Sequence, residues 1–114
     1  MTRYNFGDVI LINFPFTNLQ TSKQRPAVIV SSEMYQESRP DIILMAITSQ
    51  IRKPLSTGEA IVEDWERTGL IKPSVFKPII ATIEKDKIIR KLGQLSSNDK
   101  LRLNEIIQTI LGTD

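Results

Sequence analysis

The chain contains no cysteine and no histidine. Without cysteine, disulfides and thiolate metal sites are excluded, and without histidine the sequence lacks both the commonest general base and the commonest metal ligand. Any hydrolytic chemistry must therefore come from carboxylates, arginine, lysine, tyrosine or hydroxyl groups. We accordingly expect neither a metal site nor a cofactor.

Long apolar segments are also missing. No apolar run approaches the roughly 18 residues that are needed to span a bilayer, and residues 1–8 lack the apolar middle of a secretion signal. We therefore expect a cytoplasmic protein with no membrane partner. With 114 residues, 40% hydrophobic and 25% charged, the chain fits one globular domain over residues 1–114.

Negative charge is absent from two long stretches. The formal net charge is only +2, but no Asp or Glu occurs from position 9 to 32 or from 42 to 58. If loops from both stretches lie on one face, that face is cationic and suits a polyanion. Chance unevenness in a small chain explains the same pattern equally well. The basic residues of these stretches are Lys23, Arg25, Arg52 and Lys53.

The first two thirds of the chain predict β-strands, because short runs rich in β-branched residues alternate with polar segments. Pro26 opens the second run, and Pro78 interrupts the fifth, which favours an edge position for that strand. The polar segment 15–24 is long for a hairpin connection, and long loops in compact domains tend to be functional. The predicted strands are 9–14, 27–31, 42–47, 60–62, 76–83 and 88–92.

The C-terminus predicts an amphipathic helix. Ser96 and Asp99 fit a capping box at its start, and Gly112 stands where a helix usually ends. Strands followed by one such helix indicate a mainly β fold, a small barrel or curled sheet with a packed C-terminal α-helix. Exposed sheet edges are hidden by closure or by a partner, so we expect a dimer. The apolar stripe of the helix is Leu103, Ile106, Ile107, Ile110 and Leu111.

Two strand boundaries carry side chains with suitable chemistry. Arg25 lies between the long loop and the second strand, and its planar guanidinium can bind a phosphate through two hydrogen bonds. Thr48 and Ser49 place two hydroxyls at the end of the third strand, where site residues are common. The alternatives are an arginine paired with a nearby carboxylate and hydroxyls that cap a turn.

The carboxylates of residues 63–66 are the other candidates, either for acid–base chemistry or for Mg²⁺. Glu63, Asp64 and Glu66 lie close together in the sequence, but they lack further partners at a convincing ligand spacing. We expect them to form a solvated face. The sequence also contains no phosphate-binding glycine loop and no nucleophile elbow.

Taken in order and spacing, five segments resemble the MazF/PemK family of toxins, and the resemblance runs from about Gly7 to Leu111. It implies a small SH3-like barrel of the MazF/PemK/CcdB type with a C-terminal helix, a homodimer, and metal-independent cleavage of single-stranded RNA. It also implies a cognate antitoxin whose acidic segment covers the RNA groove. The segments are Gly7–Val9, Gln24–Ser31, Ala46–Gln50, Gly69–Ser74 and Ala81–Ile83.

The resemblance also implies site residues. The family's catalytic arginine and threonine correspond to Arg25 and Thr48, and Ser49 is a candidate helper. Many members carry a Gly-x-Glu-Gln element in the first long loop, whereas residues 18–24 contain neither glycine nor glutamate. The cut sequence is therefore not implied. The candidate RNA contacts are Phe16, Lys23, Gln24, Gln50, Arg52, Lys53 and Lys77.

These residues fit a mechanism in which RNA supplies its own nucleophile, the 2′-OH, and leaves a cyclic phosphate and a 5′-OH. Arg25 would stabilise charge on the phosphate, and Thr48 would donate to a phosphate oxygen or orient the 2′-OH.

Two alternatives stay open. One is a CcdB-like, non-enzymatic toxin that inhibits a topoisomerase, although the tryptophan-rich end of that group is missing and the single tryptophan is Trp65. The other is a non-catalytic nucleic-acid-binding barrel, which the cationic stretches fit equally well.

Overall fold

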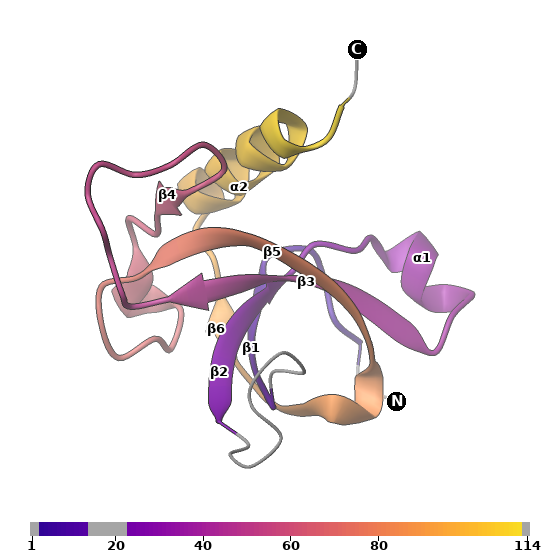
Figure 1. Cartoon of the computed structure of the whole chain (residues 1–114). Coiled ribbons are helices and arrows are strands. Elements are labelled where there is room, and N and C mark those ends of the chain that lie inside the picture. The colour runs from indigo at the N-terminus through magenta and orange to yellow at the C-terminus, as the bar shows by residue number, and fades with distance from the viewer. Residues whose placement is uncertain (1–2, 14–22, 113–114) are drawn as a thin grey trace.

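The computed structural model describes residues 3–13 and 23–112. They form a six-stranded sheet in the order β4-β5-β3-β2-β1-β6, and every neighbouring pair is antiparallel. The sheet curls strongly, yet no hydrogen-bond ladder joins its edges within the described residues (Figure 1). The strands are β1 (Asp8–Asn13), β2 (Gln24–Ile29), β3 (Asp41–Thr48), β4 (Ala60–Ile61), β5 (Val75–Glu84) and β6 (Ile88–Gln94).

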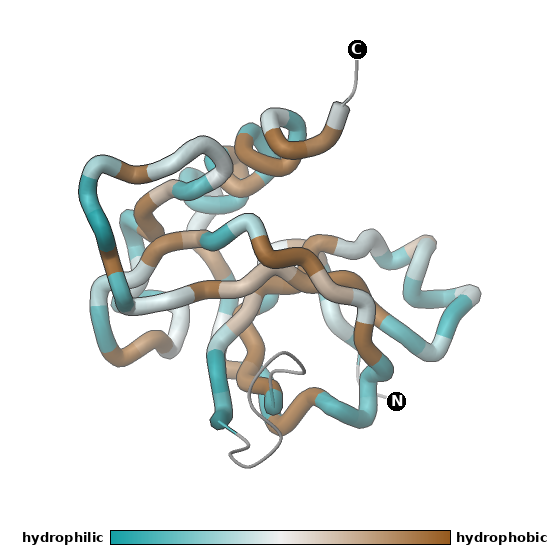
Figure 2. The backbone as a smooth tube through the Cα atoms, in the orientation of Figure 1, coloured by the Kyte–Doolittle hydropathy of each residue, from teal (hydrophilic) through white to brown (hydrophobic). Residues whose placement is uncertain are grey.

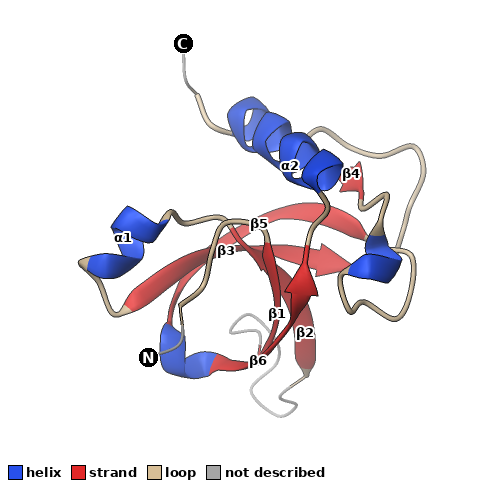
Figure 3. Cartoon of the chain, turned by 180° about the vertical axis from the view of Figure 1, so that it is seen from behind, coloured by secondary structure: helices blue, strands red, loops and turns tan. Residues whose placement is uncertain are grey.

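The described residues also form helical elements, between strands and after β6. The long helix α2 (Ser97–Ile110) lies outside the curled sheet, on the side of β4 (Figure 3). The short elements are α1 (Glu33–Glu37), η1 (Trp65–Arg67) and η2 (Lys85–Lys87). The predicted mainly β fold with a C-terminal helix is therefore confirmed, with the sheet open rather than closed.

Pro26 and Pro78 lie where the strand ladders end or shift register. Pro26 lies inside β2, opposite Leu11 of β1, while the pairing of β2 with β3 begins only at Ala27. The strand therefore starts before the proline, at Gln24, and not after it. Pro78 coincides with a shift of register in the β3–β5 ladder, where Met45 pairs with Ile80. A proline cannot donate to a ladder, so a bulge is where a sheet tolerates it.

The apolar residues of each strand alternate between two buried clusters, as the period of two in a strand requires. Val9 and Val28 face one way, toward α2, and they pack with Leu103 of that helix. Ile10 and Ile29 face the other way, into the curl of the sheet. Figure 2 shows the hydrophobic segments of the strands and of α2 in brown. Because both faces are covered, the central strands read as continuous apolar runs in the sequence.

One helix was not expected from the sequence. Residues 33–37 carry no helical periodicity, and α1 is only five residues long. The hydroxyl of Ser32 caps it by accepting a hydrogen bond from Tyr35 N at 3.2 Å. The predicted loop 15–24 falls mostly outside the described residues.

Candidate active site

The ends of β2 and β3 bring Arg25 and Thr48 together. The ladder between these strands ends where Ala27 pairs with Ala46. Beyond that pair no ladder joins the two strands, but Arg25 and Thr48 both line one groove at the strand ends. Residues two apart on a strand share a face, so both side chains lie on the face of the two alanines. The two predicted residues thus line the same groove, although 23 positions separate them in the sequence.

The hydroxyl of Thr48 is held by its own turn. Its Oγ1 accepts a hydrogen bond from Gln50 N at 3.1 Å, which is the capping interaction expected of a hydroxyl at a strand end. The side chain is half-buried, and the hydroxyl keeps its proton for donation. A capping role and a role in phosphate binding are therefore compatible in the same residue.

A groove of about 350 Å³ opens over these strand ends, and we call it the β2–β3 groove. Among the residues that the structure describes, its lining includes three cationic residues and no acidic residue. Both acid-free stretches of the sequence contribute residues to it, but only the first contributes cations, Lys23 and Arg25, while Lys72 comes from elsewhere in the chain. The lining residues are Lys23, Gln24, Arg25, Pro26, Ile47, Thr48, Ser49, Gln50, Leu70, Ile71, Lys72 and Ser74.

Arg25 is available to a ligand. Its side chain is exposed, and among the described residues no carboxylate lies within ion-pair distance of it. The described residues therefore do not support the alternative in which a neighbouring carboxylate neutralises Arg25. A guanidinium in an acid-free groove is suited to bind a phosphate.

The candidate RNA contacts divide into two groups. Lys23, Gln24 and Gln50 line the groove, whereas Arg52 and Lys53 are exposed outside its lining. Phe16 lies outside the described residues.

Lys77 also lies outside the groove lining, and an acidic residue engages it. Its Nζ is 3.5 Å from the Glu59 carboxylate. A hydrogen bond from Ser56 N, aided by Lys77, lowers the pKa of Glu59. The positive charge of Lys77 is therefore partly neutralised, which makes it a weaker candidate for RNA than Lys23.

Sequence reasoning did not assign the wall that faces Arg25 and Thr48. This groove wall consists of Leu70, Ile71, Lys72 and Ser74. Ile71 is 87% exposed, which is unusual for so large an apolar side chain, and Lys72 adds the third cation. The sequence did contain an indication of this wall, because residues 69–74 form one of the segments that resemble the MazF/PemK family.

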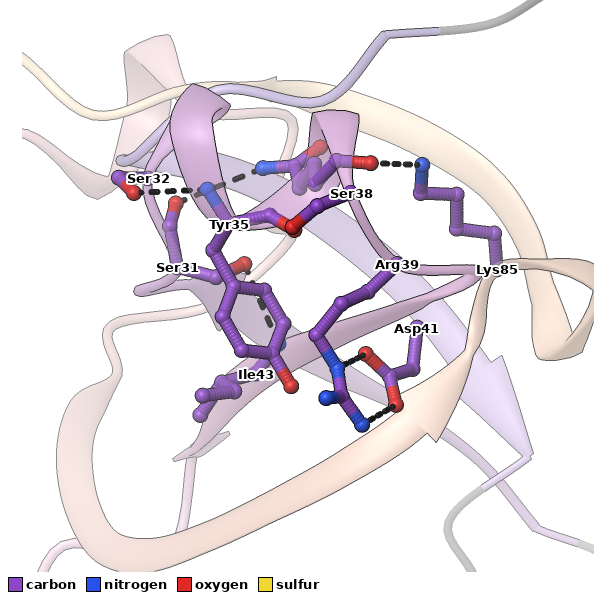
Figure 4. Close-up of polar contacts among 9 residues, drawn as sticks. Ser31, Ser32, Tyr35, Ser38, Arg39, Asp41, Ile43 and Lys85 are labelled. Atoms are coloured by element: carbon purple, nitrogen blue, oxygen red, sulfur yellow. Dashed lines mark hydrogen bonds and ion pairs between the residues drawn. The ribbon is translucent and has the colours of Figure 1, made fainter.

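A second, larger hollow of about 650 Å³ lies beside α1, away from Arg25 and Thr48. Figure 4 shows the polar contacts at its rim, where Arg39 binds both carboxylate oxygens of Asp41 at 2.9 and 3.1 Å. These hydrogen bonds hold the pKa of Asp41 below its usual value. Lys85 donates to the carbonyl of Gln36 at 3.1 Å. The contact of Lys85 joins η2 to α1, while that of Arg39 joins the connection after α1 to the start of β3.

The acidic segment 63–66 is mostly in contact with solvent, since Glu63 and Glu66 are exposed and Asp64 is half-buried. Among the described residues, no three carboxylates gather into a group that resembles a metal site. No helix in the described ranges is both long enough and apolar enough to cross a membrane.

A small, curled antiparallel sheet with a packed C-terminal helix is the architecture expected of small toxins of the MazF/PemK/CcdB type. The family model described as "PemK-like, MazF-like toxin of type II toxin-antitoxin system" matches residues 5–111. The chain therefore belongs to this family, which favours the nuclease interpretation over the CcdB-like alternative. No curated protein sequence matches the chain.

Solved structures agree with this assignment at the level of the fold. A mycobacterial endoribonuclease in complex with its cognate antitoxin is 18% identical, with a TM-score of 0.78 over 99% of this chain and 98% of that one. The toxin MazF-mt6 of Mycobacterium tuberculosis is 22% identical, with a TM-score of 0.69 over 88% and 91%. MazF of Deinococcus radiodurans, in a MazE–MazF structure, is 15% identical, with a TM-score of 0.73 over 96% and 97%.

Proposed function

We propose that this protein is a metal-independent endoribonuclease toxin that cleaves single-stranded RNA in the β2–β3 groove. The observation that carries the proposal is that Arg25 and Thr48 line one groove, in which none of the described lining residues is acidic. Family membership supports the toxin role, and the endoribonucleases among the structural neighbours support the activity.

The chemistry follows from what the groove offers. The RNA 2′-OH attacks the adjacent phosphorus, the bond to the 5′-oxygen breaks, and a 2′,3′-cyclic phosphate and a 5′-OH result. Arg25 binds the non-bridging oxygens and stabilises their growing charge, because an arginine holds its proton and makes a poor base. The hydroxyl of Thr48 donates a hydrogen bond to a phosphate oxygen or orients the 2′-OH. Ser49, which is exposed beside it, is a helper.

The proposal includes partners. The substrate is single-stranded RNA, and DNA is not cut because it lacks the 2′-OH. A cognate antitoxin with an acidic segment blocks the cationic groove, an assignment supported by the antitoxin-bound relatives. The protein acts as a homodimer in the cytoplasm. The open sheet edges support the dimer, because an unpaired edge favours a partner.

The decisive experiment incubates the purified protein with a long, weakly structured RNA in EDTA and maps the new ends. We expect discrete cuts that carry a cyclic phosphate or a 3′-phosphate, and no cuts with the Arg25→Ala variant. Cutting that appears only after Mg²⁺ is added would refute the mechanism and direct attention to Glu63, Asp64 and Glu66. No cutting by the folded protein under either condition would favour a binding module.

A further inference from the structure

The groove wall that faces Arg25 and Thr48 belongs to a loop, not to a strand. Residues 62–74 leave the sheet after β4 and return to it at β5, and the hydrogen bond from Val62 N to Ser74 O closes the loop at its neck. Within it, η1 is a single short turn. A loop with so little regular structure needs contacts from elsewhere to keep its far end in place.

Asp99 supplies such a contact at the near end of the loop. Its side chain is fully buried in the first turn of α2. One carboxylate oxygen accepts a hydrogen bond from Glu63 N at 2.9 Å, and the other accepts one from Asp64 N at 2.9 Å.

This arrangement corrects the predicted capping box. Ser96 Oγ does accept from Asp99 N at 3.2 Å, as predicted. The carboxylate of Asp99, however, does not complete the box by reaching back to the backbone of Ser96; it binds the backbone of a distant segment. The helix start and the loop are therefore joined through one side chain.

The middle of the loop is packed tightly, so its start and its far end are mechanically linked. Thr68 is fully buried, and its Oγ1 donates to Trp65 O and accepts from Leu70 N at 3.2 Å. The backbone there touches β6 directly, since a Cβ on Gly93 would lie 2.5 Å from the Thr68 carbonyl oxygen. Leu70, the first residue of the groove wall, is itself buried in the core. The loop between residues 64 and 70 is thus a continuous packed segment, which could carry a shift at residues 63 and 64 to the groove.

We propose that Asp99 is a positioning residue for the β2–β3 groove: its carboxylate holds the loop 62–74 so that the groove wall stands at the correct distance from Arg25 and Thr48. Asp99 itself does not line the groove. This inference rests on the proposed function for its kinetic consequence, while the structural link between Asp99 and the groove wall is testable without any substrate.

The test is the Asp99→Asn variant. Asparagine keeps the shape of the side chain but replaces one acceptor oxygen with an NH₂ group that must face a backbone N–H. We expect KM for a mapped RNA substrate to rise about tenfold while kcat changes by less than about twofold, because the wall binds RNA and the reacting groups are untouched. We also expect faster hydrogen exchange at the Leu70 amide.

The matched control is Ser96→Ala, which weakens the start of the same helix but leaves the two hydrogen bonds of the Asp99 carboxylate in place. Both variants are assayed well below their Tm. We expect Ser96→Ala to lower Tm with KM and Leu70 exchange unchanged. A wild-type KM in Asp99→Asn, or an equal rise in both variants, would overturn the proposal.

Two further readouts keep the proposal testable. If the wild-type protein cuts no RNA, the proposed function fails, but Leu70 exchange in the two variants still decides whether Asp99 holds the groove wall. If Asp99→Asn does not fold, Asp99→Glu carries the kinetic test, because the longer side chain displaces the carboxylate from Glu63 N and Asp64 N; a wild-type KM in that variant would overturn the proposal.

Discussion

Arg25 is the groove residue best suited to stabilise the charge of a phosphate. The side chain is exposed at the groove, and no described carboxylate pairs with it, so its charge is available to a ligand. Thr48 contributes a hydroxyl whose orientation is set by the hydrogen bond from Gln50 N. The two side chains differ in what they can do, and substitutions at each should therefore give different results.

Arg25→Ala should lower kcat by at least about 10²–10³-fold, the usual cost of removing a donor that stabilises developing charge. The rate is measured by gel with an RNA of known cut site, and circular dichroism checks that the variant is folded. Arg90→Ala is the control, because Arg90 is exposed on β6 and lies outside the groove lining. Substantial cutting by Arg25→Ala would contradict the assignment.

Thr48→Val keeps the shape of the side chain and removes its hydroxyl. We expect the single-turnover rate to fall by about 10- to 100-fold, the scale of losing one hydrogen bond that is stronger in the transition state. Thr48→Ser should recover most of the rate, because it restores the hydroxyl. If valine and threonine gave the same rate, Thr48 would serve only to cap its turn.

At the scale of elements, α2 both covers one face of the sheet and holds the loop that forms the groove wall. Its covering role depends on its apolar stripe, in which Leu103 is completely buried; Leu101, outside the stripe, is 64% exposed. The two leucines lie on opposite sides of the same helix. Replacing each of them by alanine therefore separates the effect of burial on stability from the effect of helix propensity.

Leu103→Ala should lower the free energy of unfolding by about 2–5 kcal/mol, because it leaves a cavity between α2 and the sheet. Urea unfolding followed by circular dichroism measures the loss. The control, Leu101→Ala, makes the same chemical change at an exposed position and should stay within about 0.5 kcal/mol of the wild type. Equal losses in the two variants would mean that α2 does not pack on the sheet through Leu103.

At the scale of the whole molecule, charge is sorted more strongly than the net charge of +2 suggests. Within the described part of the chain, the groove lining contains Lys23, Arg25 and Lys72 and no acidic residue, whereas the hollow beside α1 contains residues of both signs. A polyanion therefore meets one coherent cationic surface at the proposed site.

This sorting predicts a defined salt dependence. If all three groove cations contact phosphates, log K for a non-cleavable RNA analogue should fall against log salt with a slope of about −2, since single strands lose roughly 0.7 per contact. Lys72→Gln should reduce the slope by about 0.7. Lys87→Gln, an exposed change on η2 outside the groove, should leave it unchanged. A slope near zero would argue against phosphate binding in the groove.

Much of the fold was readable from the sequence, because strand and helix periods are local properties. The runs around Val9, Val28 and Met45 predicted strands, and the stripe through Leu103 predicted α2; all appear in the structure. The family and the pair Arg25 and Thr48 were also predicted. That these two residues act together was predicted only from the resemblance to the MazF/PemK family, however, because 23 positions separate them in the sequence.

Other features required the tertiary structure. The pairing of β2 with β3 brings Arg25 and Thr48 into one groove, and strand register depends on hydrogen bonds between segments that are distant in the chain. The groove wall at Leu70 and Lys72, and the carboxylate of Asp99 that binds the backbone of residues 63 and 64, arise from the same long-range packing. Local pattern thus determined which segments become strands and helix, while contacts across the chain decided which side chains meet.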